Sequence, residues 1–398
     1  MRSLSALTQT VADLRSGGRG KMLFTVAFGW FLSISVRMIY PALLPSLRTA
    51  YGLTLTTAGL LLTVLWVAYG LGQLPSGILA DWAGERLLLI VSSLLAAAML
   101  ALVVVAESAV VLFVATTCFG LVTVLYGVSR FTVLTEIYSD HLGTATGVTM
   151  AAGDVGNAVM PPAAGLLAAA VAWQYGFGLA IPLFVLAAVG LWVALPTGSP
   201  ISTPLAEQVS LDGVLPTLSR PAVRQATTLL VLWAVIIQAF IGFYPTYLID
   251  VKGLSTQVAT GLFGFFFGLG ALVKPTHGRA YDRIGVRYPL LGLMCTAVVA
   301  LAALPFVRDV WSLLVVTVLA SSLLGYETIV VSDPTRRLPE QTRGTNLGAL
   351  RTVYIMLGAL SPVVFGAVAD RGYFDEAVFG IALLGCVSVV LVLYGVEY

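Results

Sequence analysis

The stretch GILADWAGER, residues 77–86, is a short polar segment between two long apolar runs, and GRAYDRIGVR, residues 278–287, closely resembles it. Four positions pair between the two copies at a constant offset of 201 residues: Gly77 with Gly278, Asp81 with Asp282, Gly84 with Gly285 and Arg86 with Arg287. Because one glycine motif can recur by chance, the rest of the sequence must show whether the repeat extends further.

The same offset relates other parts of the chain. Residues 52–54 read GLT and residues 253–255 read GLS. Four more pairs follow it: Gly143 with Gly344, Gly147 with Gly348, Pro161 with Pro362, and Gly165 with Gly366. An ordered set of matches through five consecutive apolar runs predicts an internal duplication.

The duplication predicts the domain organisation. We expect an N-terminal bundle at residues 22–195 and a C-terminal bundle at residues 225–398. A polar, basic tail at residues 1–21 precedes them, and residues 196–224, rich in proline and serine, form a linker.

Composition places the chain in a membrane. Of the 398 residues, 59% are hydrophobic and 10% are charged, and the mean hydropathy is +0.97. A net charge of +2 does not suggest a nucleic-acid partner, and the three cysteines, all in apolar runs, predict neither a disulfide framework nor a metal site. No phosphate-binding loop, HExxH or GxSxG motif is present, so we do not expect an enzyme.

Twelve apolar runs of about 20 residues are each long enough to cross a bilayer as a helix. They do not alternate polar and apolar residues as barrel strands would, so an all-α integral membrane protein is predicted. The runs lie near 22–46, 55–77, 87–106, 110–135, 143–170, 173–195, 225–249, 256–276, 288–307, 310–332, 344–368 and 377–396.

Basic residues set the expected orientation, because they concentrate on the cytoplasmic side of membrane proteins. With the N-terminus inside, only Arg48, Lys252, Arg308 and Arg371 fall outside the cell, and the other loop arginines and lysines fall inside. We therefore expect a multi-pass protein of the plasma membrane with both termini in the cytoplasm.

The polar segment G-x-L-A-D-x-x-G-x-R after the second run, repeated after the eighth, resembles the signature loop of the major facilitator superfamily. The resemblance extends through the twelve runs, the linker and the half repeat. It implies two pseudo-symmetric six-helix bundles and secondary active transport by alternating access. In the first copy Trp82 and Glu85 stand where the family often has basic residues, whereas the second copy keeps Arg283.

The signature loop has two interpretations. Gly84 and Gly285 suit a tight turn between helices, and Asp81 and Asp282 can meet the free N–H groups of a helix start. By resemblance, the aspartates and the neighbouring arginines form a gate between the halves, and Arg130 joins it through Asp81. The alternatives are that the aspartates only cap helices and that Arg130 lies at the membrane interface.

Five charged residues fall inside the predicted spans, and such residues are usually paired, face a cavity or serve a function. They are Arg37, Arg130, Asp154, Glu327 and Arg351. Glu327 and Arg351 have similar depths on consecutive spans and could pair. Arg37 and Asp154 are both near the midplane, and the resemblance, which places the first and fifth spans side by side, implies a second pair. Each pair is either a static ion pair or part of a transport site. Lys274, near a predicted helix end, is expected to extend to the surface.

Arg37 resembles the first-helix arginine with which organophosphate/phosphate antiporters of the superfamily hold an anion. The matching seventh-helix position is near Ile241, so a phosphate clamp is not supported, and a monocarboxylate or a zwitterion fits better. Asp154 and Glu327 are the candidate proton carriers. Tyr40 is a candidate cavity residue, although aromatic side chains also serve ordinary packing.

The sequence thus predicts a secondary active transporter of a small organic solute, with an anionic or zwitterionic solute favoured. We expect no cofactor beyond a proton or another coupling ion, and a monomer in contact with solute and lipid. Two alternatives remain: an efflux transporter of hydrophobic compounds, and a sensor or assembly protein on the same fold that does not transport.

Overall fold

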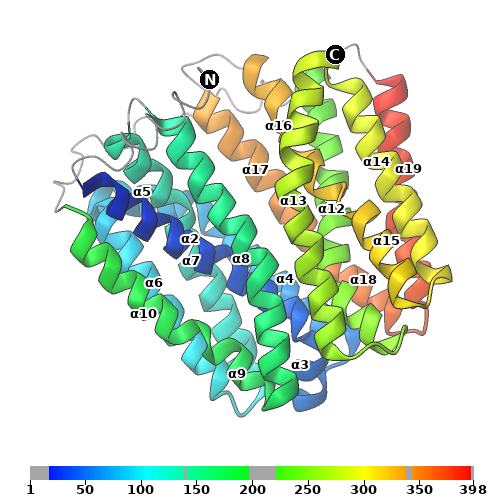
Figure 1. The fold of residues 1–398 in the computed structure, drawn as a ribbon, viewed down its shortest axis with the longest axis horizontal. Coiled ribbons are helices and arrows are strands. Elements are labelled where there is room, and N and C mark those ends of the chain that lie inside the picture. Colours follow the sequence, from blue (N-terminus) through cyan, green and yellow to red (C-terminus); the bar gives the residue numbers. More distant parts are fainter. Residues whose placement is uncertain (1–17, 139–140, 197–220, 338–342, 396–398) are drawn as a thin grey trace, which may run out of the picture.

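The structure is a computed structural model that describes residues 18–138, 141–196, 221–337 and 343–395, and every regular element in these ranges is a helix (Figure 1). The helices of the N half are α2 (Arg19–Ala42), α3 (Leu44–Tyr51), α4 (Leu55–Leu71), α5 (Gln73–Ala83), α6 (Glu85–Val104), α7 (Ala109–Ile137), α8 (Leu142–Ala170), α9 (Trp173–Gly178) and α10 (Ala180–Ala194). The helices of the C half are α12 (Pro221–Asp250), α13 (Thr256–Ile284), α14 (Arg287–Ala303), the 3₁₀ helix η4 (Leu304–Phe306), α15 (Val310–Ala320), α16 (Leu323–Arg337), α17 (Arg343–Ala359), α18 (Ser361–Ala369) and α19 (Phe374–Tyr394).

The helices have the length and polarity of membrane spans. In the described ranges, ten helical segments are long and apolar enough to cross a bilayer. Two further segments complete the twelve expected spans. One is α8, which is more polar than the ten, and the other is α4 followed by α5, which Gly72 separates. Large apolar side chains such as Val193 and Leu383 face outward, as expected for a surface in contact with lipid. The prediction of an all-α membrane protein is confirmed.

Helix starts repeat between the halves. Thr54 accepts a hydrogen bond from the backbone N–H of Thr57 at the start of α4, and Ser255 does the same at the start of α13. Ser108 and Asp309, also 201 residues apart, cap α7 and α15 in this way. Each cap satisfies a backbone N–H that the helix itself leaves free.

The turns after α5 and α13 also repeat. Gly84 and Gly285 have φ angles of 79° and 77°, in the left-handed region that favours glycine. Arg86 donates to the carbonyl oxygen of Trp192 at 2.7 Å, and Arg287 donates to that of Leu393 at 2.8 Å. The offset of 201 residues therefore applies to hydrogen bonds as well as to sequence. The domain boundaries stay predictions, and residues 1–17 and 197–220 lie outside the described ranges.

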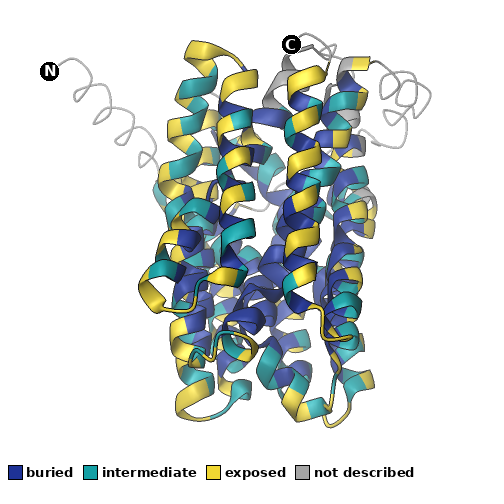
Figure 2. Ribbon diagram, turned by 90° about the vertical axis from the view of Figure 1, so that its right-hand side faces the viewer, coloured by how far each residue is buried: buried dark blue, intermediate teal, exposed yellow. Residues whose placement is uncertain are grey.

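We call the end of the bundle where α2 begins and α19 ends the terminal face, and the opposite end the far face (Figure 1). The halves meet along two seams. One joins α8 to α13, and the other joins α4 to α17 and α18. Figure 2 shows buried residues gathered between the helices and exposed residues on the outward surfaces.

At the far face, polar contacts join the halves. Arg48 of α3 forms an ion pair with Asp250 of α12. The Asp370 carboxylate accepts hydrogen bonds from the backbone N–H of Leu55 at 3.1 Å and from the Thr56 hydroxyl at 2.9 Å. A carboxylate of the C half therefore caps the start of α4 in the N half.

The α8–α13 seam is tight near the far face and opens towards the terminal face. A Cβ added to Gly165 would lie 2.2 Å from the Thr260 hydroxyl, and one added to Gly264 would lie 2.4 Å from the Ala158 carbonyl oxygen. Gly147 and Gly278 are nearer the terminal face, and a Cβ added to either of them would have no neighbouring atom within 4 Å.

The substitution Asp370→Ala should open the far face more often. Burial acts to raise the pKa of Asp370, but hydrogen bonds from Thr56 and Leu55 outweigh it and hold the pKa below its ordinary value of 3.8. The contact is therefore complete above that value and is lost as pH falls through the lowered pKa. At this exposed site we expect a loss of about 1 kcal/mol, or roughly a fivefold rise in the open population.

Distances between spin labels at Glu107→Cys and Arg308→Cys, in exposed far-face loops of opposite halves, would measure this population in a background without native cysteines. The control is Asp309→Ala, because it also removes a capping carboxylate, but Asp309 caps α15 within its own half. Equal distance distributions in Asp370→Ala and the control would contradict a capping contact between the halves.

Candidate functional site

Arg37 lies deep in the N half with aromatic neighbours. Its side chain is 2% exposed, and its Nε donates to the Ser33 carbonyl oxygen at 3.0 Å. The guanidinium lies 4.0 Å from the centre of the Tyr69 ring and 5.2 Å from that of Trp66, both on α4. These cation–π contacts offset part of the cost of burying the charge, and no carboxylate among the described residues pairs with it within 4.0 Å.

Arg130 on α7 is a second buried guanidinium. It is 3% exposed, and its flat face lies over Trp30 and 4.3 Å from the centre of the Phe131 ring. One terminal nitrogen lies 3.4 Å from the Met150 sulfur on α8. Its other two nitrogens have no hydrogen-bond partner in the described residues, which is costly for a buried charged group.

Arg351 on α17 brings a guanidinium from the C half. It interacts electrostatically with Tyr354 and Glu327, and the Tyr354 hydroxyl donates to the Glu327 carboxylate at 2.6 Å. The predicted direct pair of Glu327 with Arg351 is therefore wrong in detail. The two residues are close, but the ion pairs within 4.0 Å in the described ranges do not include them.

Tyr69 interacts with all three arginines. It interacts electrostatically with Arg37, Arg351 and Arg130, so one buried tyrosine lies near guanidiniums from α2, α17 and α7. We call Tyr69 and these three residues the arginine cluster. Glu327 is the carboxylate that interacts with Arg351, and the cluster therefore carries an excess of positive charge.

Asp154 pairs with Lys274, contrary to our expectation of a pair with Arg37. The Lys274 ammonium lies 2.6 Å from an Asp154 carboxylate oxygen across the α8–α13 seam. α2 does pack along α8, as expected, but Arg37 contacts α4 instead. Lys274 does not lie near a helix end, because α13 continues ten residues beyond it to Ile284.

The signature-loop aspartates lie inside helices. Asp81 and Asp282 are in the last turns of α5 and α13, and the N-cap positions of the next helices, α6 and α14, are Gly84 and Val286. The turn is so short that the first helix continues through the aspartate. The side chain of Asp81 lies outside the described part, so its predicted contact with Arg130 stays a prediction.

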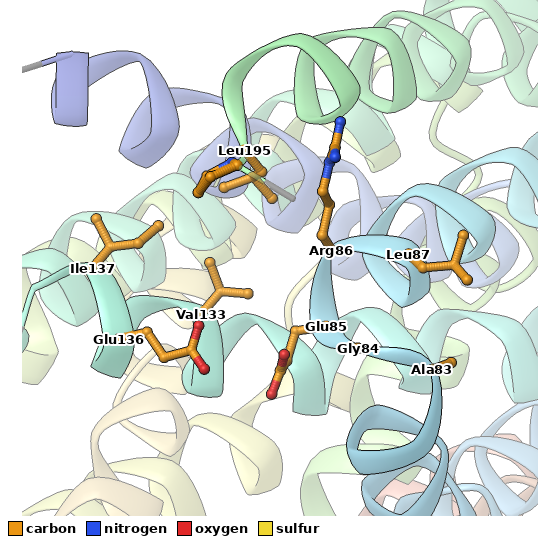
Figure 3. A pocket seen from close by; sticks show the side chains of 10 residues that line it. Ala83, Gly84, Glu85, Arg86, Leu87, Val133, Glu136, Ile137 and Leu195 are labelled. Atoms are coloured by element: carbon orange, nitrogen blue, oxygen red, sulfur yellow. The ribbon is translucent and has the colours of Figure 1, made fainter. Parts of the chain in front are cut away.

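Beside the first loop, at the terminal face, lies a cavity of about 200 Å³ lined by Glu85, Arg86, Glu136 and Leu195 among others. Figure 3 shows the carboxylates of Glu85 and Glu136 directed into the same space and Arg86 directed away, towards the end of α10. Arg86 and Arg287 thus bind carbonyl oxygens within their own halves. Gly77 and Gly278 are helical, and Arg283 and Asp282 are exposed.

The match to known families agrees with this architecture. A model of the Major Facilitator Superfamily matches residues 25–362. The chain belongs to this superfamily. The relatives that match part of the chain are named as transporters, and the long apolar helices make this member an integral membrane protein.

Solved structures of superfamily members share the fold. A bacterial homologue of the human lysosomal transporter Spinster, inward-facing and occupied, superposes with a TM-score of 0.79 at 14% identity over 94% of this chain and 96% of that one. A D-xylose–proton symporter gives a TM-score of 0.78 at 13% identity over 95% and 98%. At such identities the likeness shows the fold alone.

Curated relatives match part of the chain. A probable nitrate/nitrite transporter NarK2 of Mycobacterium tuberculosis (strain H37Rv) is 31% identical over 189 residues, which is 46% of this chain and 48% of the relative. An uncharacterized MFS-type transporter YuxJ of Bacillus subtilis (strain 168) is 26% identical over 136 residues, 34% of this chain and 35% of the relative. The chain thus matches about half of the length of the NarK2 relative and about a third of the length of YuxJ.

Three site residues were not recognised in the sequence. Tyr69 and Tyr354 resemble many other apolar-run tyrosines, and only packing shows that they contact charged groups. Lys274 was expected near a helix end because Pro275 and Gly278 follow it, yet α13 continues through both. Tyr40, proposed as a cavity residue, is fully buried between Phe119 and Phe177 and belongs to the core of the N half.

The substitution Tyr354→Phe should destabilise this superfamily member more than Tyr126→Phe does. Tyr354 donates to a charged acceptor, and losing such a bond costs about 1.5–3 kcal/mol. Tyr126 is similarly buried but donates to the neutral carbonyl of Val26 at 2.9 Å, a bond worth about 1 kcal/mol. Thermal unfolding in detergent measures both, and equal shifts in melting temperature would contradict a stronger hydrogen bond from Tyr354 to the Glu327 side chain.

Proposed function

We propose that this superfamily member transports a small anion and binds it at the arginine cluster. The observation that carries the proposal is the excess of buried guanidinium charge around Tyr69. Arg37 and Arg130 are almost fully buried, and neither forms an ion pair within 4.0 Å in the described ranges.

Electrostatic cost supports an anionic ligand. A charged side chain within the membrane costs about 2.5–3.5 kcal/mol even on insertion scales, and cation–π contacts recover about 1–2 kcal/mol of it. A bound anion would supply the missing counter-charge. Guanidinium groups offer paired N–H donors that suit planar oxyanions such as a carboxylate or nitrate.

The positions of the arginines suit alternating access. Arg37 and Arg130 belong to the N half, and Arg351 belongs to the C half. An anion that binds arginines of the N half and of the C half at once would bridge the halves. Its binding would therefore favour states in which the two halves approach each other. A neutral sugar would gain little from three guanidiniums, which favours an anion over the substrates named for the solved neighbours.

The name of the NarK2 relatives points to the same substrate class, because nitrate and nitrite are small planar oxyanions. Nitrate is the sharper probe, since it has almost no neutral form that could cross lipid unaided.

We further propose that the terminal face is cytoplasmic in the plasma membrane, in agreement with the distribution of basic residues. We also propose that the transporter acts as a monomer without a cofactor other than a coupling ion.

Counterflow into proteoliposomes tests the anion proposal. We expect uptake of nitrate, nitrite or a monocarboxylate such as formate, and none of D-xylose or uridine. The substitutions Arg37→Gln, Arg130→Gln and Arg351→Gln should each reduce the apparent affinity for the anion about tenfold or more, because each removes a charge-assisted bond worth about 1.5–3 kcal/mol.

Arg224→Gln is the matched control, since Arg224 is exposed at the start of α12 and should leave uptake unchanged. Size-exclusion profiles check that each variant folds. Uptake of a neutral solute without uptake of any anion would overturn the proposal, as would equal anion uptake by all four variants.

A further inference from the structure

The ion pair between Asp154 and Lys274 crosses the seam between the two halves in the middle of the membrane. Asp154 lies twelve residues after the start of α8, and Lys274 lies ten residues before the end of α13. At 1.5 Å per residue, both are about 15–18 Å from the terminal face. The pair thus joins two helices that alternating access must move relative to each other.

The pair also marks the place where the seam opens. One turn towards the far face, a Cβ on Gly268 would be 3.7 Å from Ala158, an ordinary contact. Towards the terminal face, Gly147 and Gly278 would meet nothing within 4 Å. The side chains of Asp154 and Lys274 are 21% and 31% exposed, so a proton can reach the carboxylate.

The charged groups that face Asp154 are cationic. Lys274 and, one turn on, His277 lie on α13, and the Arg130 guanidinium of α7 contacts Met150, one turn before Asp154 on α8. Arg37 of α2 is directed to α4, and α9 packs at the far end of α8 and contributes Tyr175. Arg130 therefore belongs to the arginine cluster and also lies one helical turn from Asp154.

We propose that Asp154 carries the coupling proton, so that a proton bound there accompanies each anion across the membrane. This inference rests on the proposed anion function. In the empty site, a carboxylate and an ammonium balance each other. When one proton and one anion enter, the proton makes Asp154 a neutral acid and the anion binds at the arginine cluster, so the added positive and negative charges cancel. Release of both on the other side restores the ion pair, and no net charge moves.

Glu327 is less suited to this role. Its carboxylate is held by the Tyr354 hydroxyl within the C half. Protonation of Glu327 would therefore not release a contact between the halves, whereas protonation of Asp154 would. Coupling requires that proton binding change the relative stability of the two access states, and only a contact across the moving seam does so directly.

Nitrate-loaded proteoliposomes test the proposal with the double variant Asp154→Asn/Lys274→Gln. The asparagine and glutamine side chains keep the size and the hydrogen bonding of the original residues, but neither can bind the coupling proton. We expect normal nitrate counterflow with at least a tenfold loss of nitrate accumulation driven by an imposed pH gradient. Asp309→Asn, a carboxylate substitution at an exposed cap, should keep both activities.

If the ion pair is only structural, the double variant will accumulate nitrate like the wild type, and the proposal is overturned. Absence of nitrate counterflow in the wild type is a different result, because it overturns nitrate as the substrate in the proposed function. Infrared spectra of the full chain without anion give an independent measurement. A carboxylic-acid band that appears on acidification should be missing in Asp154→Asn, and its persistence there would also overturn the assignment.

Discussion

A charge within the hydrocarbon layer must be balanced, and the rest of this structure depends on that constraint. The chain places arginine, lysine, aspartate and glutamate at membrane depth in a sequence that is otherwise 59% hydrophobic. Some charges are balanced internally, as in the 2.6 Å contact of Lys274 with Asp154. Others, such as Arg37 on the Tyr69 ring, are only partly compensated. The partly compensated charges are the ones that a ligand can complete.

The scaffold around these charges follows from elementary rules. Apolar length sets the spans, caps start the helices, and a glycine with positive φ lets α6 follow α5 at once. These rules act locally, so the sequence predicts the helices well. The offset of 201 residues also predicts which helices correspond, and the paired bonds of Arg86 and Arg287 reproduce it in space.

Side-chain partners were predicted less well, because they depend on helix rotation and length. Depth along the helices placed Arg37 and Asp154 close together, but depth does not say where each side chain points. Arg37 contacts α4, and Asp154 meets Lys274 because α13 extends past the point where its apolar run ends. The signature-loop aspartates lie in the last turns of α5 and α13, because these helices also extend past their apolar runs.

The repeat itself indicates where function lies, because the charges at membrane depth do not follow it. The caps, the turn glycines and the signature-loop charges are duplicated, whereas the charged positions inside the spans are not. The counterparts at the 201-residue offset are Gln73 for Lys274, Ile355 for Asp154, Val331 for Arg130, Met150 for Arg351 and Tyr126 for Glu327. A symmetric scaffold makes the two access states similar in energy, since each half can adopt the packing of the other. Charges present on one side only then let a ligand or a proton favour one state over the other, and this difference is what a transporter must use to couple two flows.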